Sequence, residues 1–476
     1  MRRTKIVATI GPSSNTPELI AQLIDAGMNV ARLNFSHGTH DEHAKRIQML
    51  REAARQAGRP LAILQDLQGP KIRTGALVNH APVPLVPGQH FTITTRDIDG
   101  TADMVDTTYK ALPGDVAPGD RILLSDGLIE LRVLSTTHDE VLTQVVFGGM
   151  LRENQGINLP GVRVSAPAVT EKDAADLEFG LAHDVDYVAI SFVRRAADVR
   201  DVKQRIAAAG KSIPVIVKIE KPEALDDLPA ILAECDGVMV ARGDLGVEMP
   251  AEQVPLVQKR LIKAANDAGL PVITATQMLE SMIQNPRPTR AEASDVANAI
   301  LDGTDAVMLS GETANGKFPV EAVQTMARIA EAAEAANPTP ELTDEPWAET
   351  DDHDIARAMS AAACAIVDRL SVTAIVAFTI SGNTARLVSR QRPRVAIFAF
   401  TPAQEVYQRL SLVWGVTPLL TPFVDRLDSL GELVSETLIS RGLVEAHDMV
   451  VITGGHPLPV RGATNFVKVM RLETRG

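Results

Sequence analysis

The sequence predicts an α/β protein whose largest part is a (β/α)8 barrel, and two features support this prediction. Short apolar runs, of the kind found in buried parallel strands, recur along the chain. Helical patterns fill most of the intervals between them, which is the alternation of a TIM barrel. The predicted barrel strands are Lys5–Thr9, Asn29–Phe35, Leu61–Asp66, Tyr187–Phe192, Val215–Glu220, Gly237–Ala241, Val272–Thr276 and Ala306–Leu309.

The interval between Asp66 and Thr170 interrupts the barrel pattern, because it has no helical periodicity. Its Val- and Thr-rich runs are separated by turn signals such as Pro87-Gly88, which predict a small all-β domain. An insertion at the mouth of a barrel makes a natural lid. We therefore expect barrel residues 1–70, an inserted β domain at 71–166, further barrel residues 167–338 and a C-terminal domain at 339–476.

A polar, proline-bearing linker from Asn337 to Asp352 precedes the C-terminal part of the chain. Helical and strand patterns alternate beyond it, which predicts a separate small α/β domain. Its expected helices are 353–370, 385–390 and 427–440, and its expected strands are 374–379, 395–400, 449–452 and 466–472.

Composition limits the class of protein. The chain has 476 residues, 45% of them hydrophobic, and a net charge of −13, which describes a globular protein with an ample core. The acidic balance argues against nucleic acid as the main partner. Cys235 and Cys364 lie in apolar surroundings and indicate a reducing compartment. With no visible signal peptide and no apolar run near the ~20 residues of a membrane span, we expect a cytoplasmic protein that does not cross a membrane.

Two predicted strands end abruptly in charge, which is unusual for buried strands. The carboxyl ends of barrel strands form the active-site mouth, so Glu220 and Asp244 would offer hard oxygen ligands to Mg²⁺ or Mn²⁺. Lys218 shares a face with Glu220, because strand side chains repeat every two residues. An ammonium beside a metal carboxylate suits a phosphoryl-bearing anion. The alternative is that these residues form two surface ion pairs.

The second strand ends in polar side chains that alternate in the same way. Arg32, Asn34 and Ser36 share one face and together suit a phosphate or a carboxylate. The alternative for Arg32 is an ion pair that ties two barrel loops together. His37 follows as a weaker candidate for a nucleotide contact, and a satisfied loop histidine is an equal alternative.

Three more strand ends complete the set of candidates. Asp66 precedes Lys71 and Arg73 where the inserted domain leaves the barrel. Thr276 would present a hydroxyl at the seventh strand, unless it is an ordinary helix N-cap. Ser310 and Glu312 would form a proton path with Thr276, or merely cap the next helix.

Common nucleotide-binding motifs do not explain the chain. Neither the Walker phosphate loop nor the G-x-G-x-x-G fingerprint is present. The residues alone therefore indicate metal-assisted chemistry on a small phosphorylated anion, without naming the substrate.

The motifs at these strand ends closely resemble those of pyruvate kinase. The match runs in order over nearly the whole chain, including the inserted and C-terminal domains. The segments that carry it are Val30–Gly38, Lys218–Glu220, Met239–Gly246, Ala275–Met282, Pro286–Glu292 and Met308–Ala314.

The resemblance implies transfer of a phosphoryl group from phosphoenolpyruvate to ADP, giving pyruvate and ATP. Glu220 and Asp244 would hold the divalent metal, and Lys218 would stabilise the phosphoryl group in flight. Lys218, Arg32, Arg73 and the metal would together neutralise charge. Thr276, with a water chain near Ser310 and Glu312, would protonate the enolate.

The resemblance also implies binding roles and an assembly. Backbone groups of Ala241, Arg242 and Gly243 would seat the substrate carboxylate at a helix N-terminus. A homotetramer is the implied assembly. Asn34, His37, Arg73 and Asp126 would lie on the nucleotide side, and Asn34, Ser36, Asp66 and Leu67 would line a pocket for a monovalent cation.

The chain departs from many relatives at two positions. Gln155 stands where relatives often place a Lys that meets nucleotide phosphates, which puts one ADP contact in doubt. Lys71, accompanied by Leu67 and Gln68, resembles the K⁺-independent branch, whereas K⁺-dependent relatives carry Glu. A Lys ammonium near Asp66 would replace the charge of K⁺. The alternative is a solvated loop residue whose charge never reaches the site.

A loop in the C-terminal domain predicts regulation. Ser381, Gly382, Asn383 and Thr384 run from a strand into a helix and make a plausible phosphate nest. Regulated relatives bind a phosphorylated effector at the matching loop, so we expect activation by such a metabolite, with the loop Gly454–Gly462 closing over it. The alternative is an ordinary capped turn.

Two other classes of protein compete with the kinase. A metal-dependent lyase of pyruvate-like substrates on the same barrel would not need ADP, and the inserted lid argues against it. A non-catalytic, effector-binding descendant would have lost site charges, and the intact Lys218, Glu220, Asp244 and Thr276 argue against that.

Overall fold

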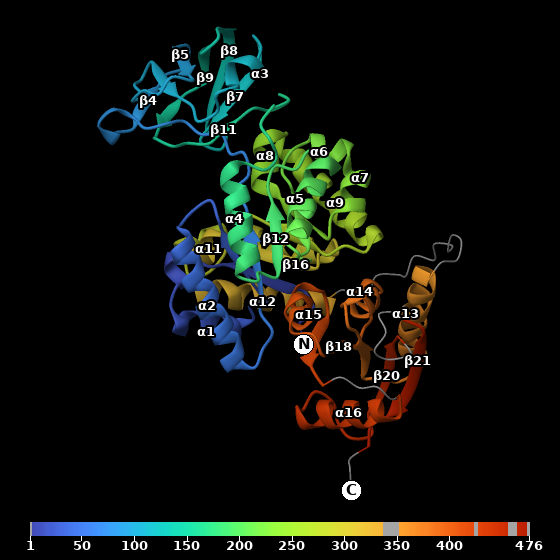
Figure 1. Ribbon diagram of the computed structural model, residues 1–476. Helices are drawn as coiled ribbons and strands as arrows, with labels where there is room; N and C mark the ends of the chain where they lie inside the picture. Colours follow the sequence, from blue (N-terminus) through green and yellow to red (C-terminus); the bar gives the residue numbers. More distant parts are fainter. Residues whose placement is uncertain (1, 337–351, 423–426, 456–463, 474–476) are drawn as a thin grey trace. The chain divides into compact units, whose positions relative to one another are not determined.

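The computed structural model describes residues 2–336, 352–422, 427–455 and 464–473 (Figure 1). Nearly all of the predicted linker from Asn337 to Asp352 lies outside the described residues. So does most of the loop Gly454–Gly462, expected to close over an effector; only its first two glycines are described.

Eight strands form a closed barrel in the order β1-β16-β15-β14-β13-β12-β3-β2, so the predicted fold class is confirmed. β1 pairs in parallel with β2 and β16, as do β13 with β14 and β15 with β16. The carboxyl ends of the strands in such a barrel share one rim. The strands are β1 (Lys5–Thr9), β2 (Val30–Asn34), β3 (Ala62–Asp66), β12 (Tyr187–Ile190), β13 (Val215–Ile219), β14 (Gly237–Ala241), β15 (Val272–Ala275) and β16 (Ala306–Leu309).

Burial on both faces explains why these strands are visible in the sequence. Every residue of β1, β3 and β14 is buried, so successive apolar residues fill the middle of each strand rather than alternating with polar ones. The buried polar residues of β1 and β3, Lys5, Thr9, Gln65 and Asp66, stand at the strand ends. The predicted barrel strands differ from the observed ones by at most two residues at an end, because the sequence pattern continues beyond the first or last ladder position, as at Leu61, Phe192 and Glu220.

Helices with local start and stop signals separate the strands. Thr16 caps α1 by accepting from the backbone N–H of Leu19, and Gly27, at φ 117°, ends it in a left-handed conformation that a Cβ would strain. α1 packs against α2 and α12 (Figure 1). The longer barrel helices are α1 (Pro17–Ala26), α2 (His40–Ala57), α4 (Glu171–Ala182), α5 (Ala196–Ala208), α7 (Leu228–Glu234), α9 (Val254–Ala268), α10 (Arg290–Leu301) and α12 (Pro319–Ala336).

The inserted segment is a β domain with its own core, as predicted, and it contains one short α-helix, α3 (Leu112–Asp115). Its sheet has the order β11-β7-β8-β9-β5-β6, and β4 pairs separately with β10. Phe91 and Ile93 of β5 lie in the core with no exposed surface. The strands are β4 (Val83–Leu85), β5 (His90–Thr94), β6 (Met104–Asp106), β7 (Arg121–Leu124), β8 (Ile129–Thr136), β9 (Glu140–Phe147), β10 (Gly149–Leu151) and β11 (Ile157–Asn158).

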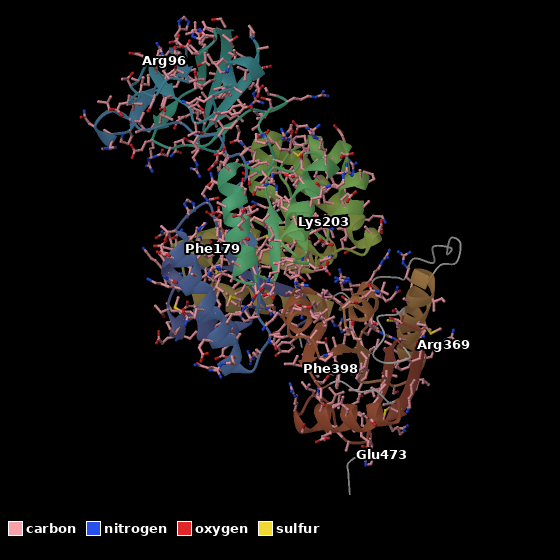
Figure 2. All side chains as sticks on the ribbon, viewed as in Figure 1. Arg96, Phe179, Lys203, Arg369, Phe398 and Glu473 are labelled. Carbon is pink, nitrogen blue, oxygen red and sulfur yellow. The ribbon has the colours of Figure 1, made fainter. Side chains whose placement is uncertain are left out.

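The C-terminal domain is a five-stranded sheet in the order β19-β18-β17-β20-β21, with β21 antiparallel to β20. Side chains of α13 (Asp352–Arg369) and α14 (Asn383–Arg390) pack in one core, and those of α16 (Leu427–Ser440) pack with Phe398 in another (Figure 2). The strands are β17 (Ala374–Phe378), β18 (Ala396–Thr401), β19 (Val416–Leu420), β20 (Met449–Gly454) and β21 (Phe466–Arg471).

Two elements of this domain are missing from the sequence prediction: β19 and the helix α15 (Gln404–Arg409). β19 contains Pro418, which argues against a central strand. The strand lies at the edge of the sheet, where only one side needs ladder hydrogen bonds, so the proline is tolerated. α15 has only six residues, too few for a clear helical period.

The C-terminal domain contacts the amino ends of barrel strands. The Lys5 ammonium, at the start of β1, donates to the carbonyl of Val416 over 2.6 Å, and its burial lowers the pKa of Lys5 to about 7. Arg392 pairs with Asp305, just before β16, over 3.0 Å and lies over the ring of Trp414. These contacts are made at the amino ends of β1 and β16, the ends opposite to the rim formed by the carboxyl ends.

Two simpler expectations can also be compared with the structure. Cys235 and Cys364 are free and buried, and burial raises the pKa of each thiol to about 12. Within the described part of the chain, no helix is both long and apolar enough to cross a membrane.

Candidate active site

The Lys218 ammonium lies at the meeting point of three barrel strands. Its Nζ is 2.9 Å from Glu220 Oε1, just beyond β13, and 3.3 Å from Asp66 Oδ1, the last residue of β3. It also donates to Ser191 Oγ, just beyond β12, over 2.8 Å. The predicted proximity of Lys218 and Glu220 is therefore observed, and Asp66 joins them.

Glu220 is buried, and its surroundings disfavour the ionised carboxylate. Its Oε2 accepts the backbone N–H of Phe192 over 2.6 Å. Burial raises its pKa to about 7, although the Lys218 charge acts to lower it, and the Asp244 carboxylate adds to the rise. A divalent cation bound to both carboxylates would relieve this repulsion.

The donor set fits Mg²⁺ or Mn²⁺. In the described segments, no group of three or more His, Cys, Asp or Glu residues is placed to hold a metal ion. Two carboxylates suffice for Mg²⁺ when substrate oxygens and waters supply the remaining ligands. Glu220 and Asp244 would hold the ion.

A short helix follows β14 without a connecting loop. α8 (Arg242–Glu248) places Asp244 in its first turn, and Ala241 is its N-cap residue. The start of a helix favours anions, which is consistent with the predicted carboxylate seat at Ala241, Arg242 and Gly243. The Arg242 guanidinium itself is directed to Gln258, with Nη1 donating to Oε1 over 3.3 Å.

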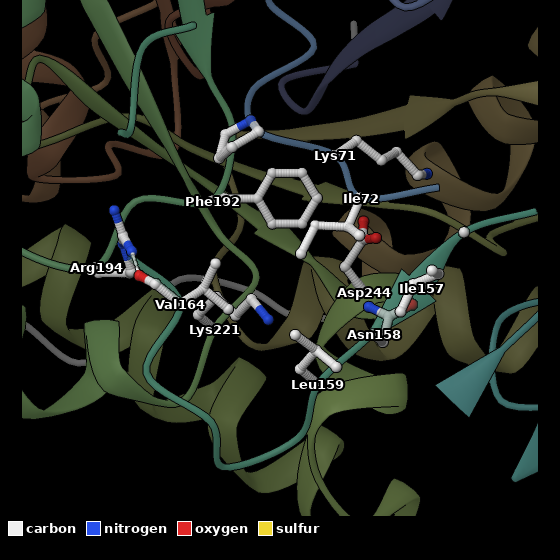
Figure 3. A pocket seen from close by; sticks show the side chains of 12 residues that line it. Lys71, Ile72, Ile157, Asn158, Leu159, Val164, Phe192, Arg194, Lys221 and Asp244 are labelled. Carbon is white, nitrogen blue, oxygen red and sulfur yellow. Dashed lines mark hydrogen bonds between the residues drawn. The ribbon is translucent and has the colours of Figure 1, made fainter. Parts of the chain in front are cut away.

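A cavity lies where the two connections of the inserted domain meet the barrel rim (Figure 3). Lys71, Arg194 and Lys221 contribute positive charge to its lining, and Asp244 contributes negative charge. Arg194 also donates to the carbonyls of Val164 and Ala166. Lys71 therefore faces the same cavity as a predicted metal ligand.

Arg32, at β2, is buried and is oriented by a neighbouring strand. Its Nη1 donates to Thr9 Oγ1 over 3.0 Å, and the Thr9 hydroxyl in turn donates to the carbonyl of Leu309 over 2.9 Å. Asn34 uses its side-chain oxygen to accept the backbone N–H of Ser36 over 3.1 Å.

Thr276 has an unusual backbone. Its φ is 71°, which is uncommon for a β-branched residue, and φ of the next residue, Gln277, is 53°. Strained backbone of this kind is concentrated at functional sites. The next element is a 3-10 turn at Glu280–Ile283, so Thr276 is not a helix N-cap. Its hydroxyl is 2.6 Å from the carbonyl of Ala275, to which it donates.

Glu312 is fully buried and joins two rim loops. Its Oε1 accepts the backbone N–H of Leu279 over 3.0 Å, and its Oε2 accepts that of Ser310 over 2.7 Å. The Ser310 side chain makes no cap bond to α11 (Gly311–Ala314). Glu312 thus positions the loop that follows Thr276.

The nucleotide-side candidates of the inserted domain lie near its connections to the barrel. Arg73 Nη1 donates to the carbonyl of Asn154 over 3.0 Å, and the Gln155 amide donates to the carbonyl of Glu153 over 3.2 Å. Asp126 is exposed in the turn between β7 and β8. A Cβ added at Gly156 would lie 3.9 Å from Asp126 Oδ1 and 3.7 Å from Lys71 Cε.

Comparison with known proteins identifies the family. The model of the pyruvate kinase barrel domain matches residues 1–323, and that of the pyruvate kinase alpha/beta domain matches residues 357–470. The chain belongs to the pyruvate kinase family. Pyruvate kinase 2 of Synechocystis sp. is 50% identical over 98% of this chain and 79% of its own length.

Two further relatives support the assignment to this family. The pyruvate kinase of Corynebacterium glutamicum is 48% identical over 98% of this chain and 97% of its own length. A crystal structure of a pyruvate kinase from Cryptosporidium parvum matches with a TM-score of 0.92 and 39% identity, covering 99% of this chain and 96% of that one. The activity of this pyruvate kinase is therefore phosphoryl transfer from phosphoenolpyruvate to ADP, giving pyruvate and ATP, with a divalent metal.

Sequence reasoning missed two residues that orient this pyruvate kinase's charges. Ser191 follows β12 and holds Lys218, and Thr9 ends β1 and holds Arg32. Each is a hydroxyl at the end of a buried strand. A hydroxyl at the end of an apolar run is the sequence signal that could have identified both residues, because a polar residue there faces the rim rather than the core.

Proposed function

We propose that the Lys218 ammonium stabilises the phosphoryl group as it leaves phosphoenolpyruvate. The observation that supports this proposal is the contact of the Lys218 ammonium with Glu220, Asp66 and Ser191, which holds one positive charge where three strands end. A divalent ion bound by Glu220 and Asp244 supplies further positive charge to the substrate. Asp66 and Ser191 would keep the Lys218 ammonium in place when Glu220 is bound to the ion.

The remaining residues take the roles implied by the family. Arg32 and Arg73 neutralise phosphoryl charge, and the N-terminus of α8 at Ala241, Arg242 and Gly243 binds the substrate carboxylate. Thr276 delivers a proton to the enolate carbon, together with a water chain near Ser310 and Glu312. The Glu312 carboxylate also holds the loop that follows Thr276 through its bond to the backbone N–H of Leu279. Asn34, His37 and Asp126 lie toward the nucleotide.

Pyruvate formation measured with and without ADP, and with and without Mg²⁺, tests this assignment. Turnover that requires both is the expected result. Pyruvate release that proceeds with metal alone would contradict the proposed phosphoryl transfer and favour a lyase.

We also propose that the enzyme does not require K⁺. A pocket for a monovalent cation would comprise Asn34, Ser36, Asp66 and Leu67. The supporting observation is that Lys71 and Asp244, a proposed ligand of the divalent ion, line the same cavity. A compact ammonium on a flexible stem is able to supply the charge that K⁺ would bring.

Wild-type turnover is expected to be close to full without K⁺, in a tetramethylammonium salt at constant ionic strength. Lys71→Glu is expected to lower activity by roughly tenfold or more, with K⁺ restoring part of it, because a carboxylate there repels the phosphoryl group and recruits a cation. Lys110→Glu, an exposed change in the same domain, is the control. A large rise in wild-type turnover on addition of K⁺ would show that Lys71 does not replace the ion.

We propose, finally, a phosphorylated activator at the start of α14. Gly382 has φ 87° and its N–H donates to Thr379 Oγ1 over 2.8 Å, while the N–H of Asn383 lies 3.4 Å from the Ser381 hydroxyl. The Thr384 hydroxyl is buried against that of Thr464 at 2.8 Å, so Ser381 and Asn383 would carry most of the phosphate contact.

A screen of sugar phosphates and AMP at sub-saturating phosphoenolpyruvate should find an activator. Ser381→Ala is expected to weaken the response several-fold, because one hydrogen bond to a charged group is lost. Ser440→Ala, an exposed change in the same domain, should respond like wild type. An unchanged response in the Ser381 variant would remove this loop from consideration. The homotetramer and the cytoplasmic location stay predictions, and sedimentation tests the first.

A further inference from the structure

A buried carboxylate, Glu248, connects the inserted domain to both segments that carry the predicted metal ligands. Lys221 Nζ lies 2.5 Å from Glu248 Oε1, and Asn158 Nδ2 donates to the same oxygen over 3.0 Å. The Glu248 side chain is 1% exposed and that of Lys221 is 11% exposed. We call these three residues the hinge triad; none of them is among the residues that bind metal or substrate above.

Each member of the hinge triad belongs to a different part of the site. Lys221 directly follows Glu220, and Glu248 is the last residue of α8, whose first turn carries Asp244. Asn158 lies in β11, which pairs with β7 through Ile157 and Asn158 only. Figure 3 shows Lys221, Asn158 and Asp244 around one cavity.

The physics of Glu248 explains why it needs both partners. A carboxylate at the carboxyl end of a helix meets the negative end of the helix dipole, which disfavours it. Burial adds a desolvation cost that a paired ammonium and a second hydrogen bond offset. Moving β11 away from α8 would remove one of those two bonds, so Glu248 favours one position of the inserted domain.

We propose that the hinge triad is a positioning device that favours one position of the inserted domain relative to Glu220 and Asp244. The turn between β7 and β8 carries Asp126, so the position of β11 determines where that turn meets the nucleotide. This inference rests on the proposed nucleotide role of the inserted domain. It adds Lys221, Glu248 and Asn158 as residues that act on ADP binding without touching it.

Asn158→Ala and Asn158→Asp test the proposal, because they alter the contact with the inserted domain and leave the Lys221–Glu248 pair in place. Asn158→Asp puts a second carboxylate against Glu248 and repels the inserted domain. We expect it to raise the KM for ADP by roughly tenfold, and Asn158→Ala to raise it less, since a neutral gap only loses a hydrogen bond. The KM for phosphoenolpyruvate and the affinity for Mn²⁺ should stay within about twofold.

Asn79→Asp is the matched control, because Asn79 is an exposed residue of the same domain. Hydrogen–deuterium exchange of residues 68–74 and 155–162 gives a second readout. Faster exchange of these connections in Asn158→Asp, but not in Asn79→Asp, supports the proposal. Equal rises in both KM values, or an ADP KM within about twofold of wild type in a folded Asn158→Asp variant, would overturn it.

One outcome separates this inference from the function on which it rests. If ADP with Mg²⁺ fails to slow exchange in any part of the inserted domain of the wild-type enzyme, the nucleotide role of that domain is wrong, and the inference falls with it. If ADP slows exchange there but the Asn158 variants behave like wild type, only the hinge triad is wrong.

Discussion

Lys218→Met is expected to lose about 10²-fold or more in turnover while the protein still folds and binds Mn²⁺. The Lys218 ammonium is the positive charge that Glu220, Asp66 and Ser191 all contact, and methionine keeps most of the length of the side chain without the charge. Steady-state kinetics with ADP and phosphoenolpyruvate, beside a thermal unfolding curve, measures both quantities.

Lys45→Met is the control for this prediction, since Lys45 is exposed on α2. It should keep wild-type turnover. A well-folded Lys218→Met enzyme with near-wild-type kcat would remove Lys218 from the phosphoryl transfer and leave it as a structural partner of the two carboxylates.

Glu220→Gln is expected to lower turnover by at least ~10²-fold and to weaken Mn²⁺ binding strongly, because an amide is a poorer ligand than a carboxylate for a hard cation. Glu220→Gln should also abolish the stabilisation of the folded protein by Mn²⁺. Burial already favours the neutral form of Glu220, so the amide is tolerated without metal. The increase in Tm that Mn²⁺ gives the wild-type protein should disappear, since a ligand stabilises only the state that binds it.

Thermal unfolding with and without Mn²⁺ measures this difference, and Glu252→Gln, an exposed change just before α9, serves as the control. A variant that still gains the full Mn²⁺-dependent Tm would show that the ion does not depend on Glu220.

The sequence by itself determined the barrel, the inserted β domain and most of the candidate charges. Strands buried on both faces have apolar residues in succession rather than in alternation, so Lys5–Thr9 and Gly237–Ala241 are predicted with the bounds that are observed. Period-two alternation placed Lys218 and Glu220 on one face. These signals are local, since each depends on the burial of a few consecutive residues.

Only the tertiary structure decided which partners those charges have. Ser191 meets Lys218 across 27 positions of sequence, and Asn158 meets Glu248 across 90. The left-handed backbone at Thr276 and the edge position of β19, with its proline, were equally hidden. The physical reason is that both features depend on which distant segments of the chain come together in the folded protein. Residue type and spacing within a short segment do not specify a hydrogen-bond partner 90 positions away or a position at the edge of a sheet.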